Sequence, residues 1–387
     1  MENVFVGARG YLALKKQTDK DTAVTPTVFV PYYEESLQTM NEKHRQGSVK
    51  GNRNAAQDTH QGLRSHGGDI KILAEPNTAA HIFNMLMTAG APSGAGPYTY
   101  AYTVGDSEVY YTADVKKGKY VERFIGVKAN SVKPAYEENI AQFEVSLSAL
   151  ASFKVATVAS VTGSGPYTIT LNTDYDPTPT KGLVVGDIIE VGGINAIVDS
   201  VASATTITVS EDVSALSGGE QLFLRAQTPS YSLLTPFSWA RTEYRFGADA
   251  SAALSATHTP LDDGTEWELT HANEADEGAH TTGSYDPSDL RRTIFDGTVT
   301  AVRVFNSLTQ TEDFLDNNKQ ALVVRMFAGN TSTYELRLTF NHLKSIEQTK
   351  ETAFDSVTKT TDTLAPQVDA SDGVAVGVTI INNLSTL

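Results

Sequence analysis

The 387-residue sequence contains no cysteine, which excludes disulfides, thiolate metal ligands and thiol catalysis together. It has no run of about 18 apolar residues, so no transmembrane helix or membrane anchor is predicted. The first residues lack a basic region ahead of a long apolar stretch, so no secretory signal is predicted either. Lys and Arg number 30 against 46 Asp and Glu, a net charge of −16. This acidic balance argues against wrapping duplex DNA, because phosphate binding depends mainly on Lys and Arg.

What remains is the composition of an ordinary globular protein, with 40% hydrophobic and 20% charged residues. We therefore expect a chain made soluble in the cytoplasm. Its length is comfortable for two or three domains.

Alternation of apolar and polar side chains is the dominant pattern. Residues 334–340 place Tyr, Leu, Leu and Phe on one face and Glu, Arg and Thr on the other, which predicts a half-buried strand. The same alternation recurs in residues 143–149 and 374–380. The chain is therefore predicted to be mainly antiparallel β.

Two segments carry helical signals. The stretch PNTAAHIFNMLMTAG has helical spacing of its apolar residues, with Asn77 as the expected N-cap and Gly90 just past the C-terminus. The stretch TQTEDFLDNN opens with a capping-box pattern, Thr309 followed by Glu312. Both helices are expected to flank a sheet.

Between Ala156 and Ala226 the amino-acid composition changes, and small residues, threonines and glycine-rich turns become frequent. This segment predicts a small inserted β-barrel or sandwich. The remaining segments, 1–155 and 227–387, show the same order of predicted elements: strands, a long polar loop, a strand, a helix and closing strands. We interpret them as two tandem β-sandwich or barrel folds that arose by duplication, interrupted by the insertion.

The order of elements near the start resembles the tail tube (major tail) proteins of long-tailed bacteriophages. The opening GARGYLALKKQTDKDTAVTPTVFVPYYEESLQ has a Gly-x-x-Gly pattern and a Lys-Gln-Thr turn. A long polar loop with Arg53 and Arg64 follows, then a strand beginning at Gly68 and Asp69 and an amphipathic helix after a proline. The resemblance covers about the first 150 residues well and the last 155 loosely. Residues 156–226 depart from it and resemble the accessory domains that some tube proteins carry outside.

The resemblance implies a non-enzymatic structural virion protein whose sheets join around a ring, with rings stacked into a hollow tube for DNA ejection. Because the fold is duplicated, it implies trimeric, pseudo-hexameric rings. The implied partners are further copies of the chain, a tape-measure protein in the lumen, tail terminator and tail-tip proteins, and DNA in transit without specific binding. No cofactor and no metal are expected. The alternative is a carbohydrate- or cell-binding module of a phage or surface fibre, with its site on the insertion.

Two loops in equivalent positions have opposite charge. The first, residues 41–68, is basic, and the second, residues 259–287, holds only acidic charges. We predict that they meet across subunits or between rings, although two solvated loops would have the same composition. The residues predicted to make this contact are Lys43, Arg45, Lys50, Arg53, Arg64, Asp262, Asp263, Glu266, Glu268, Glu274, Asp276 and Glu277.

Signs of catalysis or metal binding are weak. His271, Asp276, Glu277 and His280 lie within ten residues, but their spacing matches no metal motif, and a solvated loop is favoured. The histidines of the basic loop lack a serine elbow or a partner acid placed by spacing. The glycine clusters at Gly163 and Gly192 lack the lysine of a phosphate-binding loop and read as turns.

Trp239 and Trp267 are the only tryptophans in the sequence. Few basic residues surround them, so they are predicted to be packing or interface anchors and not base-stacking platforms.

Overall fold

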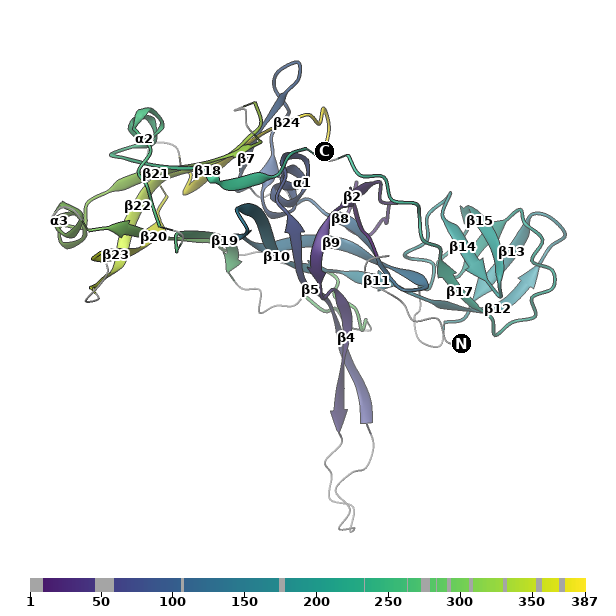
Figure 1. Ribbon diagram of the computed structural model, residues 1–387. Coiled ribbons are helices and arrows are strands. Elements are labelled where there is room, and N and C mark those ends of the chain that lie inside the picture. Colours follow the sequence, from purple (N-terminus) through teal and green to yellow (C-terminus); the bar gives the residue numbers. More distant parts are fainter. Residues whose placement is uncertain are drawn as a thin grey trace, which may run out of the picture.

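The computed structural model describes residues 10–45, 59–105, 108–173, 178–232, 234–262, 264–272, 279–282, 284–290, 294–305, 309–329, 333–352, 357–368 and 373–387. The predicted mainly β character is confirmed, with 24 strands in the described ranges. The second half of the chain, the first half and the inserted barrel follow one another along an elongated body, and a long hairpin projects from its middle (Figure 1).

The first half contains β1 (Leu12–Lys16), β2 (Val28–Val30), β3 (Tyr32–Glu35), β4 (Gln38–Arg45), β5 (Thr59–Leu73), α1 (Pro76–Leu86), β6 (Thr88–Ala89), β7 (Tyr98–Thr103), β8 (Tyr111–Lys117), β9 (Tyr120–Glu137), β10 (Ile140–Ala149) and β11 (Ala151–Phe153). The inserted segment contains β12 (Ala156–Thr162), β13 (Tyr167–Leu171), β14 (Ile188–Val191), β15 (Ile194–Val201), β16 (Thr206–Val209) and β17 (Gln221–Leu224). The second half contains β18 (Phe237–Gly247), α2 (Ala250–Ser255), β19 (Glu266–Ala272), β20 (Ile294–Val304), α3 (Thr309–Leu315), β21 (Gln320–Ala328), β22 (Glu335–Glu351), β23 (Lys359–Pro366) and β24 (Val376–Asn382).

The two halves have the same strand order, which supports the predicted duplication. In the first half the antiparallel order is β1-β8-β9-β10-β5-β4. In the second half it is β18-β21-β22-β23-β20-β19. The strand after each of these sets also corresponds, because β11 pairs with the beginning of β9 and β24 with the beginning of β22. Each half is thus a two-layer sandwich in which one long strand belongs to both layers.

The long strands share a β-bulge at equivalent positions. In β9, Asn130 is skipped in the pairing with β10, and in β22, Ile346 is skipped in the pairing with β23. A bulge places two residues opposite one and bends the strand at that point. Here the bulge lies where the long strand passes into the second layer of its sandwich.

Eight strands from both halves join in one closed ring, in the order β9-β10-β18-β21-β22-β23-β20-β19. Helix α1 lies between the layers, and all of its residues are buried. Trp267 of β19 packs there against Phe83 of α1 and Phe143 of β10, with ring centroids 6.3 and 6.2 Å apart. The largest hydrophobic core is therefore shared by the two halves.

The ends of α1 differ from the prediction. Glu75, and not Asn77, is the N-cap, since its carboxylate accepts hydrogen bonds from the backbone N–H groups of Asn77 at 3.1 Å and Thr78 at 2.5 Å. Pro76 follows at the first helical position, where its fixed φ suits the helix. The helix ends earlier than predicted: its C-cap is Met87 and not the residue before Gly90. Residues 88–89 leave the helix and pair with β7 as strand β6.

The other two helices are short. Helix α3 begins at the predicted Thr309. Helix α2 was not predicted, and it is capped by Asp249, whose carboxylate accepts from the N–H of Ala252 at 2.8 Å.

The inserted segment is a closed barrel of six strands, in the order β12-β13-β16-β15-β14-β17. A buried ion network joins it to the first half. Arg123 of β9 donates to Asp114 of β8 at 2.7 Å and to Asp187 of the barrel at 2.6 Å. The Thr25 hydroxyl also donates to Asp187, at 2.8 Å. All three charged side chains are at most 2% exposed, so the junction is joined by buried charge pairing.

In the polar loop predicted for residues 41–68, the described residues 41–45 and 59–68 are instead paired β-strands. β4 pairs with the first part of β5, from Gln38 opposite Gly67 to Arg45 opposite Thr59, and this arm projects from the body (Figure 1). Polar residues form strands here because the backbone of β4 is hydrogen-bonded to that of β5 from Gln38 to Arg45, so neither strand needs an apolar face to be buried. Gly62 allows the imidazole of His44 to lie across the pair, since an added Cβ would be 2.7 Å from its Nε2 atom.

Candidate assembly interface

A short seam of β-pairing joins the two halves. Val132 and Ser131 of β9 pair with Leu269 and Thr270 of β19. A single residue pair between β10 and β18, Ile140 opposite Ser238, closes the ring on the other side. The seam extends one half's sheet with an edge strand of the other.

The seam lies within a sheet of the order β4-β5-β10-β9-β19-β20-β23-β22. The two edges of this sheet, which are equivalent to the two edges that meet in the seam, have no strand partner among the described residues. One is the outer edge of β3 and β4, which pair only with β5, and the other is the second part of β22, beyond Leu343. Met40 on the first edge is 49% exposed, and Ile346 on the second is 61% exposed. Open edges with exposed apolar side chains are templates for pairing with another chain.

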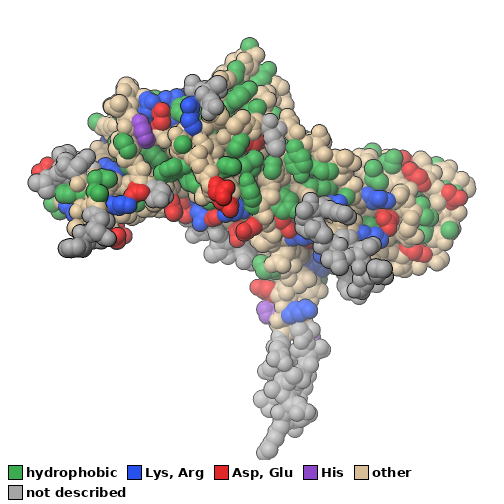
Figure 2. All heavy atoms as spheres, viewed as in Figure 1, with side chains coloured by type: hydrophobic (Ala, Val, Ile, Leu, Met, Phe, Trp, Pro, Cys, Tyr) green, Lys and Arg blue, Asp and Glu red, His purple; other side chains and the backbone are tan. Residues whose placement is uncertain are grey.

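The sheet that contains β3, β5, β9, β10 and β19 has a polar and acidic face. It contains a shallow groove of about 540 Å³ over β3, β5, β9, β10 and β19. Its charged lining residues are Glu34, Glu35, Asp69, Lys71, Lys133, Glu144 and Glu268, with serines between them. These side chains alternate along their strands with core residues such as Ile70 and Val145. We call this surface the acidic face; acidic side chains with a few lysines gather there in Figure 2.

The base of the arm is held by the second half of the same chain. Asp286 lies 3.1 Å from Nε2 of His66 and 3.5 Å from Nη1 of Arg64, both on β5. The backbone N–H of Arg64 donates to the carbonyl of Tyr285 at 2.8 Å. On its other side, His66 Nδ1 is 2.8 Å from the Thr39 hydroxyl of β4. The basic and acidic loops therefore meet at least once within one chain.

The Asp286 contact predicts a pH-dependent loss of stability. Burial alone would raise the pKa of Asp286, but the hydrogen bond and charge of His66 and the charge of Arg64 outweigh it, so the pKa is lower than the ordinary 3.8. A lowered pKa stabilises the fold above that pH, and the contribution disappears as the pH falls through the folded value. We expect Asp286→Asn to cost about 1 kcal/mol at pH 7 and almost nothing at low pH. Urea unfolding at both values tests this, and an equal deficit at both would contradict it.

The other predicted contact residues are distributed as follows. Lys43 and Arg45 lie on β4 of the arm, whereas Lys50 and Arg53 fall outside the described residues. Asp262 forms an ion pair with Lys359 inside the second half. Four more predicted contact residues also lie outside the described ranges: Asp263, Glu274, Asp276 and Glu277. Contact between these loops across subunits stays a prediction.

Glu266 and Glu268 belong to strand β19 and not to a loop, and Glu268 lines the groove of the acidic face. The edge residues Met40 and Ile346 were not singled out in the sequence. Their position follows only from strand pairing, for which the sequence has no local signal.

Of the candidate metal and packing residues, His271 and the two tryptophans have structural roles in the described part of the chain. His271 is buried, with Nε2 2.8 Å from the carbonyl of Leu86, while Asp276 and Glu277 are not described. Within the described ranges no group of three His, Asp or Glu side chains is arranged to hold a metal. Trp267 is a core residue, and Trp239 packs edge-on against Tyr136 at 4.9 Å.

No helix in the described part of the chain is long and apolar enough to span a membrane. A scan against protein-family models finds no match to this chain, and a search of curated proteins finds none either.

Proposed function

We propose that this chain is a structural, non-enzymatic virion protein, the subunit of a phage tail tube that closes head to tail into rings. The observation that carries the proposal is the seam between its halves. Inside the chain, β19 pairs with the second part of β9, and the equivalents of these two edges, β4 and the second part of β22, are open at the opposite ends. Repeating the internal seam between chains pairs these two edges with each other and leaves neither of them exposed.

The shared bulge gives the register of the proposed contact. Matching Asn130 with Ile346 matches Ser131 with Glu347 and Val132 with Gln348. It also matches Leu147 with Leu364, the strand partners beside the bulge.

The other edge is aligned through the next strand. Leu147 pairs with Gly68 and Leu364 with Val299, so their neighbours Gly67 and Thr298 correspond. Gln38 opposite Gly67 then corresponds to Glu268 opposite Thr298. Counting on, Thr39 and Met40 take the places of Leu269 and Thr270. In a ring, Met40 of one chain is therefore opposite Glu347 of the next.

The acidic face supports a conduit role. Its carboxylates and hydroxyls outnumber its lysines, and Lys133 is paired with Glu144 at 2.9 Å. DNA passes such a wall without sticking, since free cations would hold its phosphates. We assign this face to the channel, where a tape-measure protein would precede DNA, with terminator and tip proteins meeting the end rings.

Cross-linking tests the proposal directly, because the chain has no cysteine of its own. We expect the double variant Met40→Cys, Glu347→Cys to form a disulfide between chains on mild oxidation of concentrated protein, since opposed residues of antiparallel strands are close enough. Each chain contributes one site of each kind, so complete oxidation of a three-chain ring yields covalent trimers on a non-reducing gel.

The matched control is Met40→Cys with Glu351→Cys, on the same face of β22 but about 13 Å further along the strand. It should remain largely monomeric on the gel. Negative-stain electron microscopy of the same samples should show rings with a central channel. Monomers from both pairs in samples that contain rings would contradict the register, and discrete particles without a channel under all conditions would contradict the tube.

A further inference from the structure

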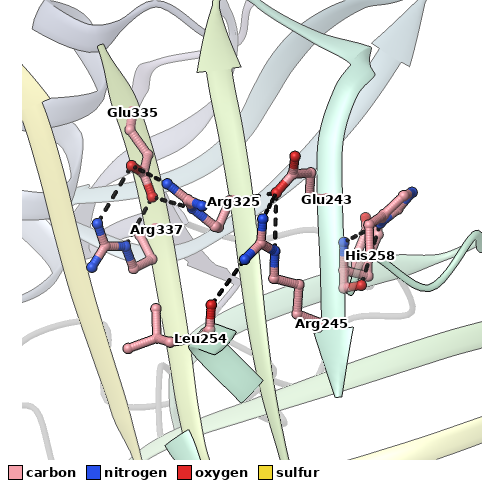
Figure 3. Close-up of polar contacts among 8 residues, drawn as sticks. Glu243, Arg245, Leu254, His258, Arg325, Glu335 and Arg337 are labelled. Carbon is pink, nitrogen blue, oxygen red and sulfur yellow. Dashed lines mark hydrogen bonds and ion pairs between the residues drawn. The ribbon is translucent and has the colours of Figure 1, made fainter. Parts of the chain in front are cut away.

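The outer surface of the second half's layer β18-β21-β22 is rich in arginine (Figure 3). Glu335 of β22 accepts from Nε of both Arg325 and Arg337 at 2.8 Å. Arg245 and Glu243 of β18 form a second pair at 2.7 Å. Arg325 and Arg337 are directly opposite each other across β21 and β22. Their neighbours along the strands are core residues, so the two arginines lie on the side away from the core.

Arg241 extends the same surface, with its guanidinium 5.8 Å from the ring of Phe327, which Arg325 also covers. Four guanidinium groups thus stand against two carboxylates. We call this surface the arginine face. It keeps an excess of positive charge on a chain that is acidic as a whole. The face lies on the opposite side of the two-layer body from the acidic face, because the core separates the two sheets.

The inserted barrel has the complementary charge. Residues 156–226 contain eight Asp and Glu against two Lys and Arg. Two of the acids, Asp199 and Glu211, lie where β15 and β16 pair, since the Ser210 hydroxyl donates to Asp199 at 2.5 Å and Glu211 accepts from the N–H of Ile197 at 3.0 Å. Asp212 follows Glu211 in the chain and accepts from the N–H of Ser214 at 3.0 Å. We call these three residues the acidic corner.

The placement of the barrel would bring it beside the second half of the next chain in a ring. The barrel lies on the side of the first half that is opposite to the chain's own second half (Figure 1). It continues the layer of β8 and the first part of β9 through β17. The equivalent layer of the second half is β18-β21-β22, which carries the arginine face. In a head-to-tail ring, the second half of the next chain is therefore the neighbour of the barrel.

We propose that the inserted barrel docks, through its acidic corner, on the arginine face of the next chain in the ring. This inference rests on the proposed ring and gives the insertion a task, to clamp adjacent chains on the side away from the acidic face. The edge strands set the register, and the clamp adds a salt-sensitive contact at each chain boundary.

Charge reversal on each side tests the clamp. We expect Arg241→Glu and Asp212→Lys, each alone, to weaken association of chains into rings about five- to ten-fold at low salt, with the loss fading at high salt. The combined variant, which exchanges the two charges, should recover most of the loss. Sedimentation velocity over a concentration series at several NaCl concentrations measures the association. Lys71→Glu is the matched control, an equal charge change on the acidic face, and should not be rescued by Asp212→Lys.

A second measurement uses proximity alone. Arg241→Cys combined with Asp212→Cys should give cross-linked oligomers with a flexible bis-maleimide in the ring state and not in dilute monomer. Two results would overturn the clamp while leaving the tube intact. In the first, the single-reversal variants form rings as stable as those of wild type. In the second, the single reversals weaken the rings but the combined variant does not recover the loss. Wild-type protein that forms no ring under any condition would overturn the proposed function itself, and the clamp with it.

Discussion

Replacing Arg123 with methionine should destabilise the protein by about 3–5 kcal/mol, the usual cost of removing one partner from a buried ion pair. The variant leaves the carboxylates of Asp114 and Asp187 buried and facing one another without their cation. Burial already raises the pKa of Asp114 even with Arg123 present, so without the guanidinium one proton must be taken up. Urea unfolding at pH 7 measures the loss, and limited proteolysis of residues 225–236 reports whether the barrel has come loose.

The control is Lys133→Met, which removes a cation from an ion pair whose two side chains are 46% and 37% exposed, and should cost less than about 1 kcal/mol. Adding Asp114→Asn and Asp187→Asn to Arg123→Met should recover part of the loss, because no unpaired charge then remains buried. An Arg123→Met protein as stable as Lys133→Met would show that the network does not hold the junction.

Truncating Trp267 to alanine should also cost about 3–5 kcal/mol, because it empties the space between Phe83 and Phe143 in the shared core. These rings belong to the first half and Trp267 to the second, so the cavity lies between the halves. The indole N–H has no hydrogen-bond partner among the described residues. Trp267→Phe therefore loses volume but no hydrogen bond, and should cost about 1–2 kcal/mol.

Fluorescence makes this experiment simple, since Trp239 is the only other tryptophan. Denaturant unfolding of Trp267→Ala, followed by Trp239 emission and by circular dichroism, should give a single transition at lower denaturant if the halves still unfold together. Equal stability of the alanine and phenylalanine variants would contradict the assignment of Trp267 as the main packing residue between the halves.

The strand-rich fold was predictable because alternation is a local property. The alternation in residues 334–340 predicts the buried face by itself. Residues 335–340 form the first part of β22, with Leu336, Leu338 and Phe340 in the core. The repeated order of elements was predictable for the same reason, because it is a succession of local patterns. The six-stranded barrel was anticipated as a barrel or sandwich, but its closure depends on pairing between β12 and β17, more than 50 residues apart in the chain.

What could not be predicted depended on partners distant in sequence. The arm has the composition of a loop and becomes a hairpin only because its two strands pair. Asp286 looked like one more acid in an acidic loop, and only the fold brings it to His66. Glu75 replaced Asn77 as the cap of α1, since its buried carboxylate also accepts from the N–H of Leu234 at 3.3 Å, in the segment that follows the barrel.

The bulge that recurs at Asn130 and Ile346 has a geometric consequence for the assembly. When strands close into a barrel, the stagger between neighbours and the number of strands together fix the tilt of the strands and the diameter of the opening. A bulge at the same place in each half imposes the same stagger at every seam, whether within a chain or between chains. In the proposed tube these two bulges therefore contribute to the bore together with the number of strands, and deleting one of them would change the stagger at every second seam.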